Sequence, residues 1–362
     1  MGEGLLQSMR DVLNRIGIGL AHAGGLHRLL GRYTAGRGAI LRMHRVRPDT
    51  GHDFAPNAAF EIAPSFLAAI VTRLREHGID IVDLDEAMRR LADPAGRRFA
   101  VLTFDDGYRG TVEHAYPVLK REGCPFTVFV TTGFADRTST VWWLTLEEIV
   151  ARQVSVAIAR EGPTEILPCR TTRQKSAAFA ALKEWFMAMG EEVQREAMRE
   201  LSWRYGVDAA AIADADMMDW DDIRRLAADP LVTIGAHSVT HPRLSALPAQ
   251  RARAEIRDSA RVIEAALGVR PRHFAYPYGA AGDAGAREFA AVAELGFSTG
   301  VTSRSNVLVA DDASRPTALP RVPIDGRYQS IRYLDLMLSG AVFALRHRFL
   351  GPGEPVRASA ST

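Results

Sequence analysis

Four side chains of this 362-residue sequence are of the types that bind metals or move protons, and they fall in two short motifs. Asp105 and Asp106 follow the apolar run 99–104, which predicts a buried strand that ends in two carboxylates. His237 and His241 follow a second strand candidate, and their spacing of four puts both imidazoles on one face of a helical turn. Two carboxylates at the end of a buried strand are costly without a cationic partner, which favours a metal ion between the motifs.

We assign different roles to the two aspartates, because neighbouring residues of an extended chain point in opposite directions. Asp106, His237 and His241 would form a ligand set that leaves one coordination position for water, as in catalytic zinc sites. Zinc fits this set best, and cobalt, nickel and manganese are the alternatives. Coordination lowers the pKa of the bound water, and Asp105 is the expected general base. Each motif taken alone also has a non-functional interpretation. The two aspartates could form an ordinary polar turn, and the spacing of the two histidines could be a coincidence on a surface helix.

The elements that carry these motifs alternate between strand and helix. Apolar and β-branched runs predict strands at 38–46, 79–82, 99–104, 126–130, 231–235, 273–276, 297–301 and 318–324. This alternation predicts an α/β fold, a closed or nearly closed (β/α) barrel, in which the chemistry sits at the carboxyl ends of the strands. Both motifs follow predicted strands, so we expect them to meet at that face.

We divide the chain into five segments. Residues 1–36 are a predicted N-terminal helical extension, and residues 37–137 and 230–335 are the two parts of the barrel. Residues 138–229 have a helical composition with little strand signal, which predicts an inserted helical lid or subdomain. Residues 336–362 are expected to form a C-terminal helix and a disordered tail.

The composition is that of a globular protein, with 47% hydrophobic and 24% charged residues. A net charge of +2 argues against a nucleic-acid partner, because such proteins carry a basic stripe. No apolar run is long enough to span a bilayer, and we see no signal peptide, so we expect a cytoplasmic protein. The run 334–345, followed by basic residues, is interpreted as a packed helix, with peripheral membrane contact as the alternative.

Three motifs resemble those of the polysaccharide deacetylases, the family with the NodB homology domain. They are Thr103-Phe-Asp-Asp-Gly107, His237-Ser-Val-Thr-His-Pro242 and Phe274-Ala-Tyr-Pro-Tyr-Gly279, and they occur in the order found in that family. The resemblance covers residues 38–135 and 230–326. It implies a distorted (β/α)7 barrel, here with a helical insertion and an N-terminal helical extension.

The resemblance also implies metal-dependent hydrolysis of an acetyl group on a sugar. Asp106, His237 and His241 would bind the metal, Asp105 would be the base, and the backbone N–H of Tyr278 would help to hold the oxyanion. We therefore expect a hydrolase of carbon–nitrogen, non-peptide bonds that removes N-acetyl groups from N-acetylglucosamine units of an oligo- or polysaccharide, similar to chitooligosaccharide deacetylases. The alternatives are an O-acetyl esterase acting on an exopolysaccharide and a catalytically inactive carbohydrate-binding barrel.

The sequence departs from the family pattern at three points. The arginine that orients the base corresponds to Ala275 here, and we predict that Arg321 takes its role, with Arg272 as second choice. The usual acid histidine is missing after the last strand, so His44 is the predicted general acid. The alternative is that His44 is a histidine of a structural turn. The tryptophan motif of the family is also missing, and the predicted sugar-binding aromatic residues are Trp142, Trp143 and Tyr276.

Overall fold

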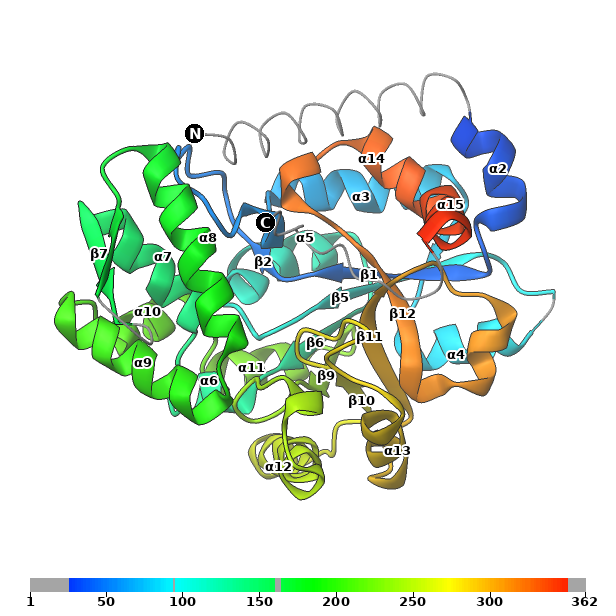
Figure 1. The fold of residues 1–362 in the computed structure, drawn as a ribbon. Coiled ribbons are helices and arrows are strands. Elements are labelled where there is room, and N and C mark those ends of the chain that lie inside the picture. The colour runs from blue at the N-terminus through cyan, green and yellow to red at the C-terminus, as the bar shows by residue number, and fades with distance from the viewer. Residues whose placement is uncertain (1–25, 94, 160–163, 351–362) are drawn as a thin grey trace.

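The computed structural model describes residues 26–93, 95–159 and 164–350, and seven parallel strands form a barrel at its centre (Figure 1). Around the ring the strands are β1 (Gly38–Met43), β5 (Phe99–Phe104), β6 (Phe126–Val130), β9 (Val232–Ala236), β10 (His273–Ala275), β11 (Thr299–Ser305) and β12 (Leu319–Pro323). β1 pairs with β12 on one side and with β5 on the other, which closes the ring. The predicted (β/α)7 barrel is confirmed.

Helices cover the outside of this ring (Figure 1). They are α3 (Pro64–Glu76), α4 (Leu84–Ala92), α5 (Tyr116–Arg121), α12 (Ala249–Leu267), α13 (Ala286–Glu294) and α14 (Ile331–Leu338). Side chains of β1 alternate between the two faces, as the pleat of a strand requires. Leu41 and Met43 belong to the cluster between strands and helices, whereas Ile40 packs inside the ring with Val101 and Leu319.

Several predicted elements have different bounds in the structure. The strand predicted at 79–82 is reduced to β4 (Asp80–Ile81), which pairs with the start of β5 outside the ring. Short pieces β2 (Arg45–Val46) and β3 (Glu61–Ile62) pair with each other just beyond β1. After β5, residues 105–110 form the loop that carries the aspartates, and the next helix begins at Thr111 with a wide turn.

The segment 138–229 is an insertion between β6 and β9, and it lies at the left of Figure 1 beside the carboxyl end of β1. Its helices are α7 (Trp142–Arg152), α8 (Thr172–Ala188), α9 (Glu191–Arg204), α10 (Ala209–Asp216) and α11 (Trp220–Ala227), and the short α6 (Thr132–Ala135) precedes it. The insertion is mainly helical, and it also contains an antiparallel hairpin, β7 (Ser155–Ile158) and β8 (Glu165–Pro168). β8 is mostly exposed and only four residues long, so its sequence carries a weak strand signal.

Both ends of the described chain meet outside the barrel. α2 (Leu26–Thr34) packs against α14 and α15 (Ala341–Leu350). The single helix predicted over 334–345 is broken at Gly340, whose φ of 69° is not helical and whose lack of a side chain lets the carbonyl oxygen of Thr34 approach. Predictions for residues 1–25 and for the tail after residue 350 lie outside the described residues.

Among the described helices, none combines the length and apolar character needed to cross a bilayer. The cytoplasmic location and the peripheral membrane contact stay predictions. Both cysteines, Cys124 and Cys169, are buried free thiols.

Candidate active site

Asp106, His237 and His241 converge beyond the carboxyl ends of β5 and β9. Asp106 Oδ1 lies 3.3 Å from His237 Nε2 and 3.2 Å from His241 Nε2. One potential ligand atom from each residue lies within 4.8 Å of the other two, and all three side chains are largely shielded from solvent. The structure therefore brings together the three residues that the sequence proposed as metal ligands.

The hydrogen bonds around this triad suit a cation. His237 Nδ1 lies 2.7 Å from the carbonyl oxygen of Ala275, which can only accept, so Nδ1 carries the proton. In a neutral imidazole, Nε2 then presents a lone pair to the oxygen of Asp106, and two facing acceptors are stabilised by a cation between them. A histidine ligand commonly has such a bond at its second nitrogen.

The net pKa shifts of Asp106 and His241 both favour binding of a metal. Burial raises the pKa of Asp106, but its contacts with both imidazoles outweigh this effect and hold that pKa well below the usual value. Burial also lowers the pKa of His241, which favours the neutral imidazole that a metal requires. The nitrogen and oxygen donor set thus fits a divalent transition-metal ion such as zinc.

Strained backbone conformations present these side chains. Asp106, Ser238, His241 and Tyr278 have φ angles of 72°, 63°, 60° and 59°. Residues other than glycine rarely adopt this left-handed backbone conformation. Each instance costs about 1–3 kcal/mol, which the surrounding structure must offset. Only one further non-glycine residue of the described chain, Arg137, has a positive φ. The strain is therefore concentrated at this site.

The carboxylate of Glu255, on α12, holds the loop between the two histidines. Its Oε2 accepts the backbone N–H groups of Val239 and Thr240, both at 2.9 Å. Thr240 Oγ1 lies 3.2 Å from Glu255 Oε1 and 2.5 Å from Oε1 of Glu191, which belongs to the insertion. The sequence analysis missed Glu255, because nothing in its local sequence separates it from other glutamates of a helix.

Replacing Glu255 with alanine is expected to weaken metal binding by about 10- to 100-fold, the usual cost of losing a group that orients a ligand. The two backbone N–H groups would lose their acceptor, and the loop that carries His241 would relax. Competition with a chelator measures the metal affinity, and thermal unfolding checks the fold. Glu264→Ala, on the same helix with a side chain that is 48% exposed, is the matched control. Wild-type affinity in Glu255→Ala would contradict the assignment.

Arg321 holds the carboxylate of Asp105 with two hydrogen bonds. Its Nη1 and Nη2 donate to Asp105 Oδ1 and Oδ2 at 2.7 and 2.6 Å, and its Nε donates to the carbonyl oxygen of Thr302 at 2.8 Å. Burial raises the pKa of Asp105, but Arg321, together with the nearby His237 and His44, lowers it by more, so the carboxyl is ionised well below neutral pH. The alternative, Arg272, instead pairs with Asp85, and its side chain is 62% exposed.

His44 reaches the same carboxylate from the end of β1. Its Nε2 lies 3.9 Å from Asp105 Oδ2, and its side chain is 15% exposed. The ring of Phe60 contacts the imidazole edge-on, with centroids 4.9 Å apart. Burial lowers the pKa of His44 to about 4, although the neighbouring carboxylates act in the opposite direction. The structure thus places His44 at the site as a neutral imidazole at neutral pH.

The two tryptophans predicted to face a sugar begin α7 and lie beside the triad. Trp142 is 6% exposed, stacks on Phe186 and donates from Nε1 to the hydroxyl of Tyr278 at 3.2 Å. Trp143 is half-buried, and its ring centroid lies 5.2 Å from that of His241. Trp143 therefore borders the triad, whereas Trp142 is buried in packing contacts.

Tyr276 and Tyr278 are two residues apart and have different environments. Tyr276 is 1% exposed, and its hydroxyl donates to the carbonyl oxygen of Thr317 at 2.7 Å. The prediction that Tyr276 contacts a sugar is corrected, because its ring lies in the apolar core. Tyr278 follows the strand in a turn, its ring lies 4.9 Å from that of His241, and its backbone N–H has no acceptor in the described part of the chain. That N–H is available to an oxyanion.

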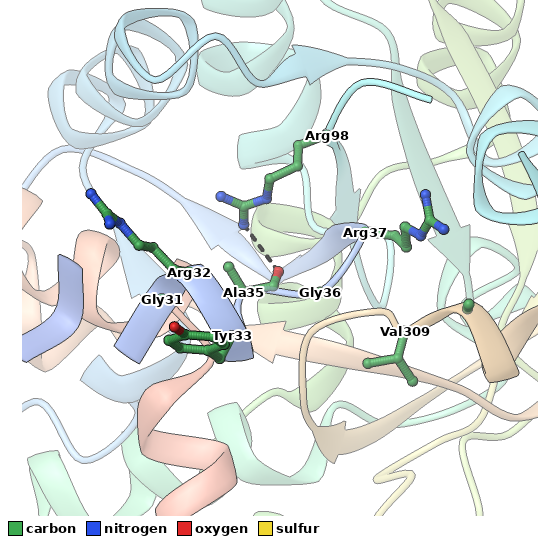
Figure 2. A pocket seen from close by; sticks show the side chains of 9 residues that line it. Gly31, Arg32, Tyr33, Ala35, Gly36, Arg37, Arg98 and Val309 are labelled. Atoms are coloured by element: carbon green, nitrogen blue, oxygen red, sulfur yellow. Dashed lines mark hydrogen bonds between the residues drawn. The ribbon is translucent and has the colours of Figure 1, made fainter. Parts of the chain in front are cut away.

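A separate hollow of about 420 Å³ lies at the other end of the barrel, where β1 and β5 begin (Figure 2). Arg32, Arg37 and Arg98 are among its lining residues. Figure 2 shows Arg98 turned toward the carbonyl oxygen of Ala35, to which it donates at 3.1 Å, and it also donates to Leu338 at 3.0 Å. Both of these hydrogen bonds come from Nη2 of Arg98, and none of the predicted site residues lines the hollow.

Comparison with known proteins gives the chain a family. The sequence model described as polysaccharide deacetylase matches residues 92–299, more than half of the 362 residues. No curated protein sequence matches the chain.

Solved structures show the same fold. The chain resembles the deacetylase PplD from Streptococcus pyogenes in complex with acetate, at 17% identity and a TM-score of 0.55, over 83% of this chain and 97% of that one. It resembles IcaB from Ammonifex degensii at 20% identity and a TM-score of 0.51, over 84% and 97% of the two chains. A de-N-acetylase from Aggregatibacter actinomycetemcomitans matches at 15% identity and a TM-score of 0.51, over 83% and 99%.

Proposed function

Because this chain belongs to the polysaccharide deacetylase family, we propose that it is a metal-dependent hydrolase that removes N-acetyl groups from N-acetylglucosamine units of an oligo- or polysaccharide. Membership of the family makes acetylated polysaccharide the substrate class. The observation that carries the finer proposal is the convergence of Asp106, His237 and His241 beside an ionised, buried Asp105. The nitrogen and oxygen donors fit zinc best, with cobalt, nickel or manganese as alternatives.

A divalent cation bound by the triad would lower the pKa of a water and polarise the acetyl carbonyl group. Asp105, held by Arg321, accepts the proton of the attacking water. The unpaired N–H of Tyr278 donates to the oxygen on which negative charge develops. His44, whose Nε2 lies 3.9 Å from Asp105 Oδ2, supplies a proton to the leaving nitrogen, a role for which its pKa must rise above about 4 when the substrate is bound.

The His44→Ala variant is expected to lower kcat about 100-fold and to bind metal as the wild type does. A general acid must be protonated, so the wild-type kcat should fall as pH rises through the pKa of His44 in the substrate complex. The variant should lose this alkaline limb of its pH–rate profile. A variant that keeps the alkaline limb would show that His44 is only a structural histidine.

Acetate release tests the function directly. The purified, metal-loaded protein is incubated with N-acetylated and O-acetylated saccharides, with and without a chelator. We expect acetate and an equal amount of free amine from N-acetylglucosamine oligomers, and none after chelation. Acetate without amine, from O-acetylated glycans only, would favour the esterase alternative. Saccharide binding without acetate release from any substrate would favour an inactive carbohydrate-binding barrel.

A further inference from the structure

The barrel contains one more cation near the reaction centre, Arg42 on β1. It pairs in register with Thr103 of β5 and with Pro323 of β12, and register partners in a parallel sheet project to the same face. Thr103 Oγ1 lies 3.2 Å from Nη1 of Arg321 inside the ring, so Arg42 stands on the inner face beside Arg321. Among the described residues, no hydrogen-bond or ion-pair partner of the Arg42 side chain is found.

This arrangement leaves Arg42 without a hydrogen-bonded anion. Asp105 already accepts both terminal nitrogens of Arg321, and Asp106 belongs to the metal triad. Arg42 is half-buried, and burial together with the charge of Arg321 lowers the pKa of Arg42 to about 10, against the effect of the two aspartates. A guanidinium held away from water beside a like charge is costly, and an anion that enters the site would offset that cost.

A second cation without a carboxylate partner lies further out, on the insertion. Lys183 of α8 is half-buried, and its Nζ lies 5.8 Å from the centroid of the Phe60 ring. Phe60 is 37% exposed, and its ring also contacts the imidazole of His44. Within the described ranges, Lys183 has no ion pair. An exposed aromatic ring thus lies between the reaction centre and Lys183, as a platform on which a sugar can stack.

We propose that the saccharide deacetylated here is acidic, with a carboxylate or phosphate group that binds Arg42 and a further anionic group that binds Lys183. This inference rests on the proposed deacetylase function and names its class of substrate. A neutral chitooligosaccharide would leave the guanidinium unpaired inside the barrel, whereas an acidic sugar gives it a charge-assisted hydrogen bond. Because the two cations belong to β1 and α8, the barrel and the insertion together recognise the acidic chain.

Matched pairs of substrates test this proposal. One pair is an oligosaccharide that alternates N-acetylglucosamine with glucuronate, and the same chain after reduction of its carboxyl groups. The other pair is a phosphorylated N-acetylglucosamine oligosaccharide and its dephosphorylated form. We expect kcat/KM to be about 10- to 100-fold higher for one acidic member than for its neutral partner, the value of a hydrogen bond to a charged group. The pair that shows the preference identifies carboxylate or phosphate.

Variants locate the preference. Arg42→Met keeps an apolar side chain of similar length and should abolish the preference, while Lys183→Met should reduce it. Arg89→Ala, whose side chain is 74% exposed on α4, should keep the preference of the wild type. Equal kcat/KM values for both members of both pairs would overturn the inference and leave the deacetylase function intact.

Absence of acetate from every substrate would instead overturn the proposed function. In that case calorimetric titration with the same saccharides decides the inference without catalysis. Tighter binding of an acidic member to the wild type than to Arg42→Met supports it. Equal affinity of the wild type for the acidic and neutral members would overturn it.

Discussion

Asp106→Asn is expected to bind no metal and to lower kcat/KM by about three orders of magnitude, since the metal supplies several kcal/mol of transition-state stabilisation. One carboxylate oxygen of Asp106 faces both imidazoles, at 3.2 and 3.3 Å. Asparagine has the same shape but carries no negative charge, so it cannot compensate a divalent cation in a buried site. Metal content by mass spectrometry and acetate release measure the two effects.

The control for this variant is Asp221→Asn, at a side chain that is 92% exposed on α11. Chelation should bring the wild type to the activity of Asp106→Asn, and added zinc should restore the wild type alone. If Asp106→Asn retained a full equivalent of metal and most of its turnover, the triad would not be the metal site. Reduced turnover with normal metal content would give Asp106 another role.

Arg321→Ala is expected to lower kcat at least about 100-fold, the range typical of general-base catalysis, while metal content stays near that of the wild type. Arg321 fixes the orientation of the Asp105 carboxylate through two short hydrogen bonds and lowers its pKa against the effect of burial. Without the arginine, burial would raise that pKa. The base must be ionised, so the fall in activity at acid pH should move to higher pH.

The stability of the fold depends on pH through the same pKa shift of Asp105. The pKa of Asp105 is lower in the folded protein than in the unfolded chain, so its ion pair contributes stability above the unfolded pKa and loses it as pH falls through the folded pKa. Breaking a buried pair costs about 3–5 kcal/mol, so Arg321→Ala needs a measurement of unfolding beside the kinetics.

Arg321→Lys provides a second variant that keeps the charge but cannot form the paired hydrogen bonds. It should have intermediate turnover and a smaller shift of the acid limb. Unchanged turnover and an unchanged pH profile in a folded Arg321→Ala protein would reject the role of Arg321.

The sequence predicted the local features of the active site. Strands β5 and β6 have the predicted bounds, because their runs of apolar and β-branched side chains are buried on both faces of the barrel wall. The four residues of the two motifs, Asp105 and Asp106 with His237 and His241, are found together because each motif directly follows a strand. In a parallel barrel, the carboxyl ends of all strands lie at one face.

Some features of the chain could not be predicted from local patterns. In an extended chain, Tyr276 and Tyr278 would point to the same side. The strand ends at Ala275, however, and a turn with a φ of 59° at Tyr278 gives the two side chains different environments. The break at Gly340 depends on the carbonyl of Thr34, which belongs to a distant helix. Strands β7 and β8 have only four residues each, the shortest run over which the alternation of a strand can be recognised.

By itself, then, the sequence determined which segments form strands, the motifs that follow them and the donor atoms available for chemistry. Short-range propensity and hydrophobic patterning identify the strands, and the motifs are read directly from the residues. Closure of the ring decided which distant residues meet. It sets Arg321 against Asp105, 216 positions earlier in the chain, and leaves Arg42 beside them without a partner. Contacts of this kind depend on strand register and on desolvation inside the barrel, which no local pattern of residues contains.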